Sequence, residues 1–221
     1  MVYVYGLFTN GTASNFIEAN NRLNQDISIA NQIWRGCINF VSGGVFDYTS
    51  RVVNAGSVAY TQALADGSPV VSIIEEFKRY NRSVNTSDKV NNAIYLVYLS
   101  GPTFSGGEVG VGGIKVEEFR SGTNAIITGQ MAMTDRAKGL DTFAHEAGHI
   151  LFNQYNPVTG SWNDDDPSGP YVDQRGIIDR FHNNDPNNLM APVGHFSTNL
   201  SSITITAAQC AKAQNSRIVT Q

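Results

Sequence analysis

The sequence predicts an α+β fold in which strands and long helices alternate, followed by a smaller, loop-rich part that ends in a helix. Apolar runs of strand length, such as residues 2–8 and 93–99, alternate with segments whose apolar residues recur at helical spacing. Regular patterns then fade after Pro157. At 221 residues the chain can bury one substantial core. We therefore expect a single domain with an N-terminal subdomain of about residues 1–155 and a C-terminal subdomain of about residues 156–221.

The first three elements follow from local patterns. Residues 2–8 are apolar and rich in β-forming side chains, which predicts a strand. Ser14 can cap a long helix whose apolar positions, from Phe16 to Trp34, recur at helical spacing, and Gly36 marks its expected end. Residues 37–41 (CINFV) predict the second strand.

The middle of the chain is predicted to hold a second helix and a buried strand. The pattern is helical between residues 52 and 80, and Ser68-Pro69 has the form of an N-cap followed by proline at the first helical position. The Asn- and Ser-rich residues 81–92 predict a loop. Residues 93–99 (AIYLVYL) form a continuous apolar run, which is typical of a strand buried on both faces.

Residues 101–113 are rich in Gly and Ser. A phosphate-binding loop would need a following GK[ST] and a helix, and neither pattern is present. We expect instead a glycine-rich edge strand or loop that lets a ligand backbone approach closely. Residues 124–129 predict a short strand, and residues 131–139 lead into the next helix.

The C-terminal part is turn-rich and acidic. Long irregular loops in compact domains are usually functional or stabilised by an ion. Several aspartates raise the alternative of a structural Ca²⁺ site: Asp164, Asp165, Asp166, Asp173, Asp179 and Asp185. Their spacing matches no EF-hand, so a solvated acidic loop is the preferred interpretation. Thr204 or Thr206 can cap a last helix from Ala207 to about Ile218.

Composition and charge exclude some classes of function. The net charge of −4 provides neither a basic surface for nucleic acid nor a polybasic membrane anchor, and no apolar run approaches the length of a membrane span. We expect no nucleic-acid or membrane partner. Only 15% of the residues are charged, which is common in secreted proteins. We expect a secreted protein whose signal or pro-segment is not part of this chain. Cys37 and Cys210 form either one disulfide or two buried free thiols.

The strongest chemical signal lies at residues 145–149, His-Glu-Ala-Gly-His, within an apolar segment that predicts a helix over residues 141–155. Positions four apart fall on one face of a helix, so His145 and His149 can share one Zn²⁺. Glu146, between them, can take a proton from a water on the metal. Two incidental histidines on a helix are the alternative. We favour the zinc interpretation, because this segment holds two of only four histidines.

A catalytic zinc needs a third protein ligand and an open position for water. His182 follows an apolar stretch and precedes a tight turn, so a loop could deliver it to the metal, and it is the favoured ligand. His195 or a carboxylate are the alternatives. Tyr155 is a poor ligand because its phenol would have to lose a proton of pKa about 10.

These residues resemble the metzincin clan of zinc metallopeptidases, in which the helix motif is His-Glu-x-x-His-x-x-Gly-x-x-His/Asp and a downstream methionine lies beneath the metal. Met190, in Asn-Leu-Met-Ala-Pro, matches that methionine. Phe152 and Tyr155 stand where the Gly and the third ligand are expected. The chain is similar to leishmanolysin-like members, in which an insertion separates the helix from the third ligand. Residues 153–181 would be that insertion and His182 the displaced ligand.

The resemblance implies a mixed, twisted β-sheet, with the motif on one of its helices. It also implies that the glycine-rich strand, about residues 108–116, pairs antiparallel with an extended substrate. We therefore expect a zinc-dependent endopeptidase that acts on protein or peptide substrates, with Glu146 as the general base. The alternatives are a non-catalytic, zinc-stabilised binding domain and a zinc amidase acting on cell-wall peptides. The sequence makes no prediction of oligomeric state.

Overall fold

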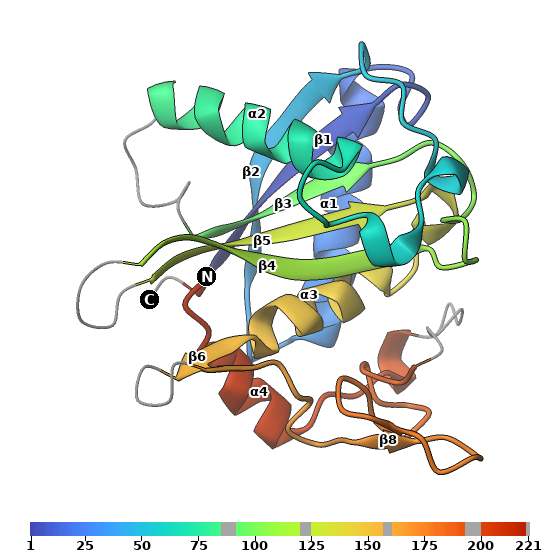
Figure 1. The fold of residues 1–221 in the computed structure, drawn as a ribbon, viewed down its shortest axis with the longest axis vertical. Helices are drawn as coiled ribbons and strands as arrows, with labels where there is room; N and C mark the ends of the chain where they lie inside the picture. Colours follow the sequence, from blue (N-terminus) through green and yellow to red (C-terminus); the bar gives the residue numbers. More distant parts are fainter. Residues whose placement is uncertain (85–91, 120–124, 157–160, 193–199, 220–221) are drawn as a thin grey trace.

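A computed structural model describes residues 1–84, 92–119, 125–156, 161–192 and 200–219. At its centre is a five-stranded sheet in the order β2-β1-β3-β5-β4 (Figure 1). The strands are β1 (Val2–Thr9), β2 (Phe40–Tyr48), β3 (Ala93–Tyr98), β4 (Gly110–Phe119) and β5 (Ala125–Met133). Strands β2, β1, β3 and β5 run parallel, and β4 is antiparallel to β5 at the edge of the sheet. The predicted mixed, twisted sheet is confirmed.

Helices cover both faces of this sheet (Figure 1). The α-helices of the described residues are α1 (Phe16–Ile33), α2 (Pro69–Val84), α3 (Thr142–Phe152) and α4 (Ala207–Gln214). Helix α2 lies on one face, whereas α1 and α3 lie on the other. The predicted combination of a sheet with long helices is therefore also confirmed.

Strand β3 explains why two helical layers are needed. All six of its residues are buried, as its continuous apolar run predicts. Because side chains alternate along a strand, Ile94 and Leu96 join the apolar cluster that contains α1 and α3. Tyr95 and Val97 join the cluster that contains α2. A strand with apolar side chains on both faces is stable only when both faces are covered.

The first helix begins one residue later than expected. Asn15, not Ser14, is its N-cap, and the Asn15 side chain accepts the backbone N–H of Glu18 at 3.0 Å. The backbone N–H of Ser14 donates to the Glu18 carboxylate at 2.8 Å, so two of the free donors at the helix start are satisfied. Phe16, expected on the buried face, is 67% exposed.

The second strand and the following segment also differ from expectation. Strand β2 begins at Phe40, not Cys37, and continues through Gly43-Gly44 to Tyr48. Pairing with β1 continues past the two glycines with a shift in register. Gly44 takes a φ of +121° at this irregularity, a conformation that glycine adopts easily. The segment before α2 is not a continuous helix and contains only the short 3₁₀ helices η1 (Ala55–Ser57) and η2 (Tyr60–Gln62).

Helix α2 begins where expected, but both α2 and β5 end later than expected. Ser68 does cap α2, since its hydroxyl accepts the backbone N–H of Val71 at 3.1 Å. Helix α2 extends to Val84, beyond the expected end at residue 80, and residues 85–91 of the predicted loop lie outside the described residues. Strand β5 continues to Met133, so residues 131–133 of the expected connection to the next helix belong to the sheet.

The C-terminal part contains short elements that the sequence did not predict. These are the hairpins β6 (Gln154–Asn156)–β7 (Ser161–Asn163) and β8 (Tyr171–Val172)–β9 (Ile178–Asp179), and the 3₁₀ helix η5 (Leu200–Ser202). Helix α4 begins with a capping box formed by Thr206 and Gln209, and ends at Gln214 rather than near residue 218.

A disulfide joins Cys37, which follows α1, to Cys210 in α4, with their Cα atoms 5.5 Å apart. The structure therefore favours the bonded alternative over two free thiols. The Cys37–Cys210 disulfide connects the layer formed by α1 and the sheet to the C-terminal helix α4. Within the described residues, no helix combines the length and apolar character that a membrane crossing requires.

Candidate metal centre

Helix α3 lies between the sheet and α4, and its own apolar residues fix it there (Figure 1). Phe143 packs edge-on against Phe40 at a ring distance of 5.4 Å. The indole N–H of Trp34 donates to the carbonyl of Ala144 at 3.2 Å. Both contacts are buried, so they set the depth and rotation of the helix that carries residues 145–149.

Glycines on the sheet allow α3 to approach closely. A Cβ atom at Gly112 of β4 would lie 2.5 Å from the carbonyl oxygen of Glu146, and one at Gly110 would lie 2.5 Å from a methyl group of Thr142. A Cβ at Gly129 of β5 would lie 2.9 Å from the side chain of Ile150. Helix packing thus accounts for Gly110 and Gly112 in the edge strand and for Gly129 in the strand beside it, a use that the sequence did not suggest.

His145 and His149 point to the same place, as their spacing predicts. Their Nε2 atoms are 3.2 Å apart. The Nδ1 atom of His145 is 2.7 Å from the carbonyl oxygen of Leu189. Since a carbonyl can only accept a hydrogen bond, Nδ1 of His145 carries a proton, and its Nε2 atom faces His149.

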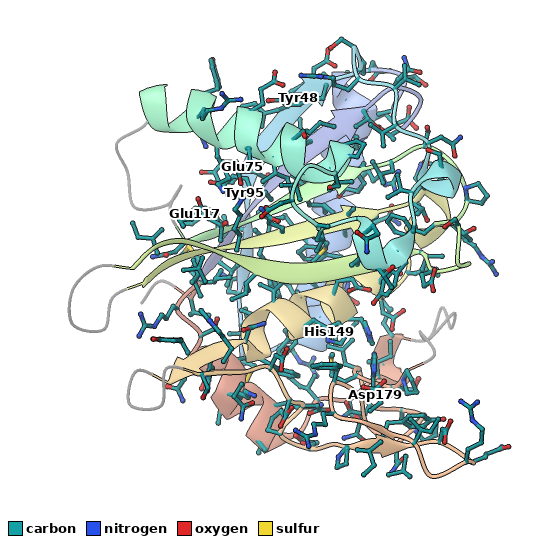
Figure 2. All side chains as sticks on the ribbon, viewed as in Figure 1. Tyr48, Glu75, Tyr95, Glu117, His149 and Asp179 are labelled. Atoms are coloured by element: carbon teal, nitrogen blue, oxygen red, sulfur yellow. A yellow bond between two sulfur atoms is a disulfide. The ribbon has the colours of Figure 1, made fainter. Side chains whose placement is uncertain are left out.

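His182 approaches from the loop after β9. Its Nδ1 is 2.7 Å from Oδ2 of Asp179, which leaves Nε2 free to bind another group. The other oxygen of Asp179 accepts the backbone N–H of Phe181 at 3.0 Å. His149 on α3 and Asp179 on the hairpin lie on the same side of the sheet (Figure 2). A carboxylate that orients a histidine in this way is the usual partner of metal-binding imidazoles.

The three rings form a group that could hold a metal ion. One ligand atom from each of His145, His149 and His182 lies within 4.8 Å of the others. Two nitrogens about 2.05 Å from a tetrahedral ion are about 3.4 Å apart, close to the observed Nε2 separation of 3.2 Å. Three imidazoles suit zinc. Burial, and then the neighbouring His145 and His182, lowers the pKa of His149 well below 6.5, so that ring is neutral, as metal binding requires.

Glu146 is a buried carboxyl beside this group. It is 7% exposed, and its Oε2 atom has no hydrogen-bond partner in the structure. Burial raises the pKa of Glu146 to about 8, although the backbone N–H of Gly112 acts in the opposite direction. A carboxyl with an unsatisfied oxygen in a cleft is suited to exchanging a proton with a bound molecule.

A cleft of about 310 Å³ opens over these groups. Its lining side chains and backbone come from four parts of the chain: Tyr60 of η2, residues 107–110 before and in β4, residues 140–149 around the start of α3, and His182 with Pro192. The candidate metal ligands and Glu146 therefore face one shared, accessible space.

Met190 lies under the helix. It is fully buried, and a Cβ atom at Gly148 would overlap its sulfur. The side-chain oxygen of Asn188 accepts the backbone N–H of Met190 at 2.9 Å, and the Met190 carbonyl accepts the N–H of Asn183 at 2.8 Å. This turn brings the Leu189 carbonyl to Nδ1 of His145, so it helps to orient that ring in the candidate metal centre.

The other ligand candidates have different outcomes. His195 lies outside the described residues. Tyr155 is in β6, where its ring packs against Trp162 at 5.1 Å, and it is not in the histidine group. Among the described residues, no carboxylate joins His145, His149 and His182 as a ligand atom within the same distance.

The acidic residues considered for Ca²⁺ do not gather into a metal-binding group within the described part of the chain. Several of them accept backbone N–H groups and so cap turns, namely Asp166, Asp173, Asp179 and Asp185. Asp179 and Tyr60 were missed as site residues by sequence reasoning. The signal for Asp179 was its place three residues before His182. Tyr60 carried no local signal.

Comparisons with known proteins add little to this geometry. No protein-family model matches the sequence, and no curated protein does. Among solved structures, the chain is similar to metalloproteinase-II from Bacteroides fragilis, with a TM-score of 0.48 and 16% sequence identity over 96% of this chain and 52% of the other. The chain thus spans about half the length of that protein. The description of the candidate metal centre therefore depends only on the geometry given above.

Proposed function

We propose that this chain is a zinc-dependent endopeptidase in which His145, His149 and His182 hold the metal and Glu146 is the general base. One observation carries the proposal: three histidine nitrogens converge beside a buried, unsatisfied carboxyl in an accessible cleft. A zinc-stabilised binding domain would have no use for a carboxyl in that position. The proposal treats the whole chain as one catalytic domain, because His182 comes from the C-terminal part.

A bound Zn²⁺ would polarise the scissile carbonyl and make a water acidic enough to lose a proton near neutral pH. The positive charge of a bound Zn²⁺ would lower the pKa of Glu146 and favour its ionised form. The Glu146 carboxylate takes the water proton as the water oxygen bonds to the carbonyl carbon and the carbonyl electron pair moves onto oxygen. When the C–N bond breaks, Glu146 passes the proton to the leaving nitrogen. Asp179 and the Leu189 carbonyl hold the rings of His182 and His145 in the tautomer that presents Nε2.

The edge strand β4 is the proposed binding site for the substrate backbone. It pairs only on its β5 side within the described sheet, and residues 108–110 line the cleft. An extended protein or peptide segment could add to the free edge through main-chain hydrogen bonds, antiparallel to β4. This arrangement would place the scissile bond over Glu146.

The finer assignment is to a metzincin-like peptidase with a displaced third ligand. Met190 beneath α3 and the antiparallel edge strand support it. The Cys37–Cys210 disulfide supports a secreted protein, since disulfides persist in oxidising compartments.

The first experiment measures zinc content and cleavage of an unfolded protein substrate, with and without a chelator. We expect one zinc per chain and cleavage that the chelator abolishes. Glu146→Gln should keep the zinc and lower kcat by about 10³-fold, because it removes the base. Glu76→Gln is the matched control, since Glu76 is an exposed residue of α2 on the opposite face of the sheet.

The outcomes separate the alternatives. Stoichiometric zinc with no hydrolysis would favour a binding domain, and hydrolysis of cell-wall peptides alone would favour an amidase. His182→Ala should lose the zinc. If that variant keeps stoichiometric zinc and full activity, His182 is not the third ligand.

A further inference from the structure

Tyr60 lines the cleft over the candidate metal centre. It begins η2, and its carbonyl accepts the backbone N–H of Ala63 at 3.1 Å. Its ring meets that of Phe104 at 6.4 Å and an interplanar angle of 70°. Phe104 is 1% exposed, so one face of the tyrosine is anchored to the core while the residue lines the cleft.

The segment that carries Tyr60 is tied to the start of the edge strand. The backbone N–H of Ser105 donates to the carbonyl of Val58 at 3.1 Å. The N–H of Phe104 donates to the carbonyl of Glu108 at 2.8 Å, which closes the loop that leads into β4. Tyr60 is therefore held in a fixed relation to the strand proposed to bind the substrate backbone.

Within the described residues, the hydroxyl of Tyr60 makes no hydrogen bond. Burial, followed by the negative charges of Glu146, Glu108 and Asp179, raises the pKa of Tyr60 to about 12. The phenol consequently keeps its proton at neutral pH and can donate a hydrogen bond throughout the working range of a hydrolase.

Few other side chains lining the cleft can act as neutral donors. The three histidines are assigned to the metal, and Glu146 exchanges the reacting proton. Thr142 is buried and directs its methyl group at Gly110 of β4. Tyr60 is the remaining lining side chain with an O–H group and no assigned role.

We propose that Tyr60 is a further catalytic residue, whose hydroxyl donates a hydrogen bond to the oxyanion that develops on the scissile carbonyl of a peptide substrate. The inference rests on the proposed peptidase function. Tyr60 keeps its own proton in this step, while the water proton passes to Glu146 and then to the leaving nitrogen. A donor fixed before the reaction stabilises the negative charge without reorganisation, and this is why such groups contribute strongly to catalysis.

The test is Tyr60→Phe, which removes the hydroxyl and keeps the ring against Phe104. We expect kcat to fall by about 10²-fold, the loss typical of one oxyanion donor, with KM and zinc content little changed. A peptide with a phosphinic acid in place of the scissile bond mimics the tetrahedral anion. Its affinity, measured by calorimetry, should fall by a similar factor, whereas the affinity of a product peptide should not.

Tyr48→Phe is the matched control. Tyr48 is also a partly buried tyrosine, but it lies at the end of β2, on the far side of the sheet from His149 (Figure 2). Unchanged kcat in Tyr60→Phe, or a change in KM alone, would overturn the role of Tyr60 and leave the peptidase proposal intact. A wild-type protein that binds zinc but cleaves no peptide would overturn both.

Discussion

Helix α3 and the segment of residues 161–192 contribute to the same candidate metal centre, but they are stabilised in opposite ways. In α3 the residues around the motif are apolar and fully buried, among them Phe143, Ala147 and Leu151. In residues 161–192, apart from the buried Leu189 and Met190, the side chains that fix the backbone are mainly carboxylates and amides. Four large apolar residues of that segment are exposed, namely Val172, Ile177, Ile178 and Phe181.

The difference shows two ways to position a candidate metal ligand. The helix fixes His145 and His149 relative to each other through its own periodicity, and apolar packing fixes the helix. His182 is positioned by hydrogen bonds, each of which contributes only about 0.5–1.5 kcal/mol net. A buried amide, Gln209 of α4, supports this polar region by donating to Asp166 at 3.0 Å and bonding to Asn188. We expect the polar region to depend more on its connections to the rest of the molecule.

The disulfide is the largest of these connections, and its removal should have the largest effect. Cys37 and Cys210 are 173 residues apart, so the chain-entropy model gives a stabilisation of about 5 kcal/mol. We expect the double variant Cys37→Ser/Cys210→Ser to lose free energy of unfolding of that order in urea titrations. Hydrogen exchange should rise first in residues 161–192.

Chemical reduction of the wild-type protein is the control, because it opens the same loop without substitutions. It should reproduce the loss of stability. A loss below about 1 kcal/mol would mean that the polar region is docked by its noncovalent contacts alone.

Besides Glu146, the apolar layer of α1 and α3 contains a second buried carboxyl with a raised pKa, Asp26, which should make the stability of the fold depend on pH. Asp26 of α1 is fully buried and accepts the hydroxyl of Tyr98 at 2.8 Å. Burial raises the pKa of Asp26 from 3.8 to about 6, although Tyr98, and the positive charge of Arg22 after it, oppose the rise. The folded state therefore binds this proton more tightly than the unfolded state.

Because the folded state binds the proton more tightly, protonated Asp26 adds to the free energy of unfolding. This contribution is fully present below pH about 4 and is lost as pH rises through about 6, a change of about 3 kcal/mol. Asp26→Asn should flatten this part of the pH profile of the unfolding free energy. Equal slopes between pH 4 and 6 for the two proteins would contradict the prediction. Asp47→Asn is the control, since Asp47 is an exposed carboxylate near the end of β2.

The smallest expected effect is on zinc affinity, and it comes from removing the carboxylate that orients His182. Asp179→Asn removes the charged acceptor for the imidazole N–H, and loss of such a partner typically lowers metal affinity by 10–100-fold. Competition with a fluorescent zinc chelator would measure the loss. Asp173→Asn is the matched control, because Asp173 caps the neighbouring turn through the N–H groups of Arg175 and Ile177 and, within the described part of the chain, bonds to no histidine. Equal zinc affinities for the two variants would show that Asp179 only shapes its turn.

Much of the sheet could be predicted because its signals are local. The apolar run of β3 and the Ser68-Pro69 start of α2 are properties of neighbouring residues, and the structure contains both. Boundaries were missed where a contact far along the chain outweighed the local pattern. Strand β2 passes through Gly43-Gly44 because it pairs with β1, and the hairpins of two or three residues have too few residues to show a period.

The sequence alone determined that His145, Glu146 and His149 lie on one helix with both rings on the same face, because that depends only on 3.6 residues per turn. It could propose His182 but could not place it. The tertiary structure decided that His182 reaches the same point, that Cys37 meets Cys210, and that Tyr60 faces the cleft. Those positions depend on how distant elements pack against each other, and packing between distant elements leaves no periodic trace in the sequence.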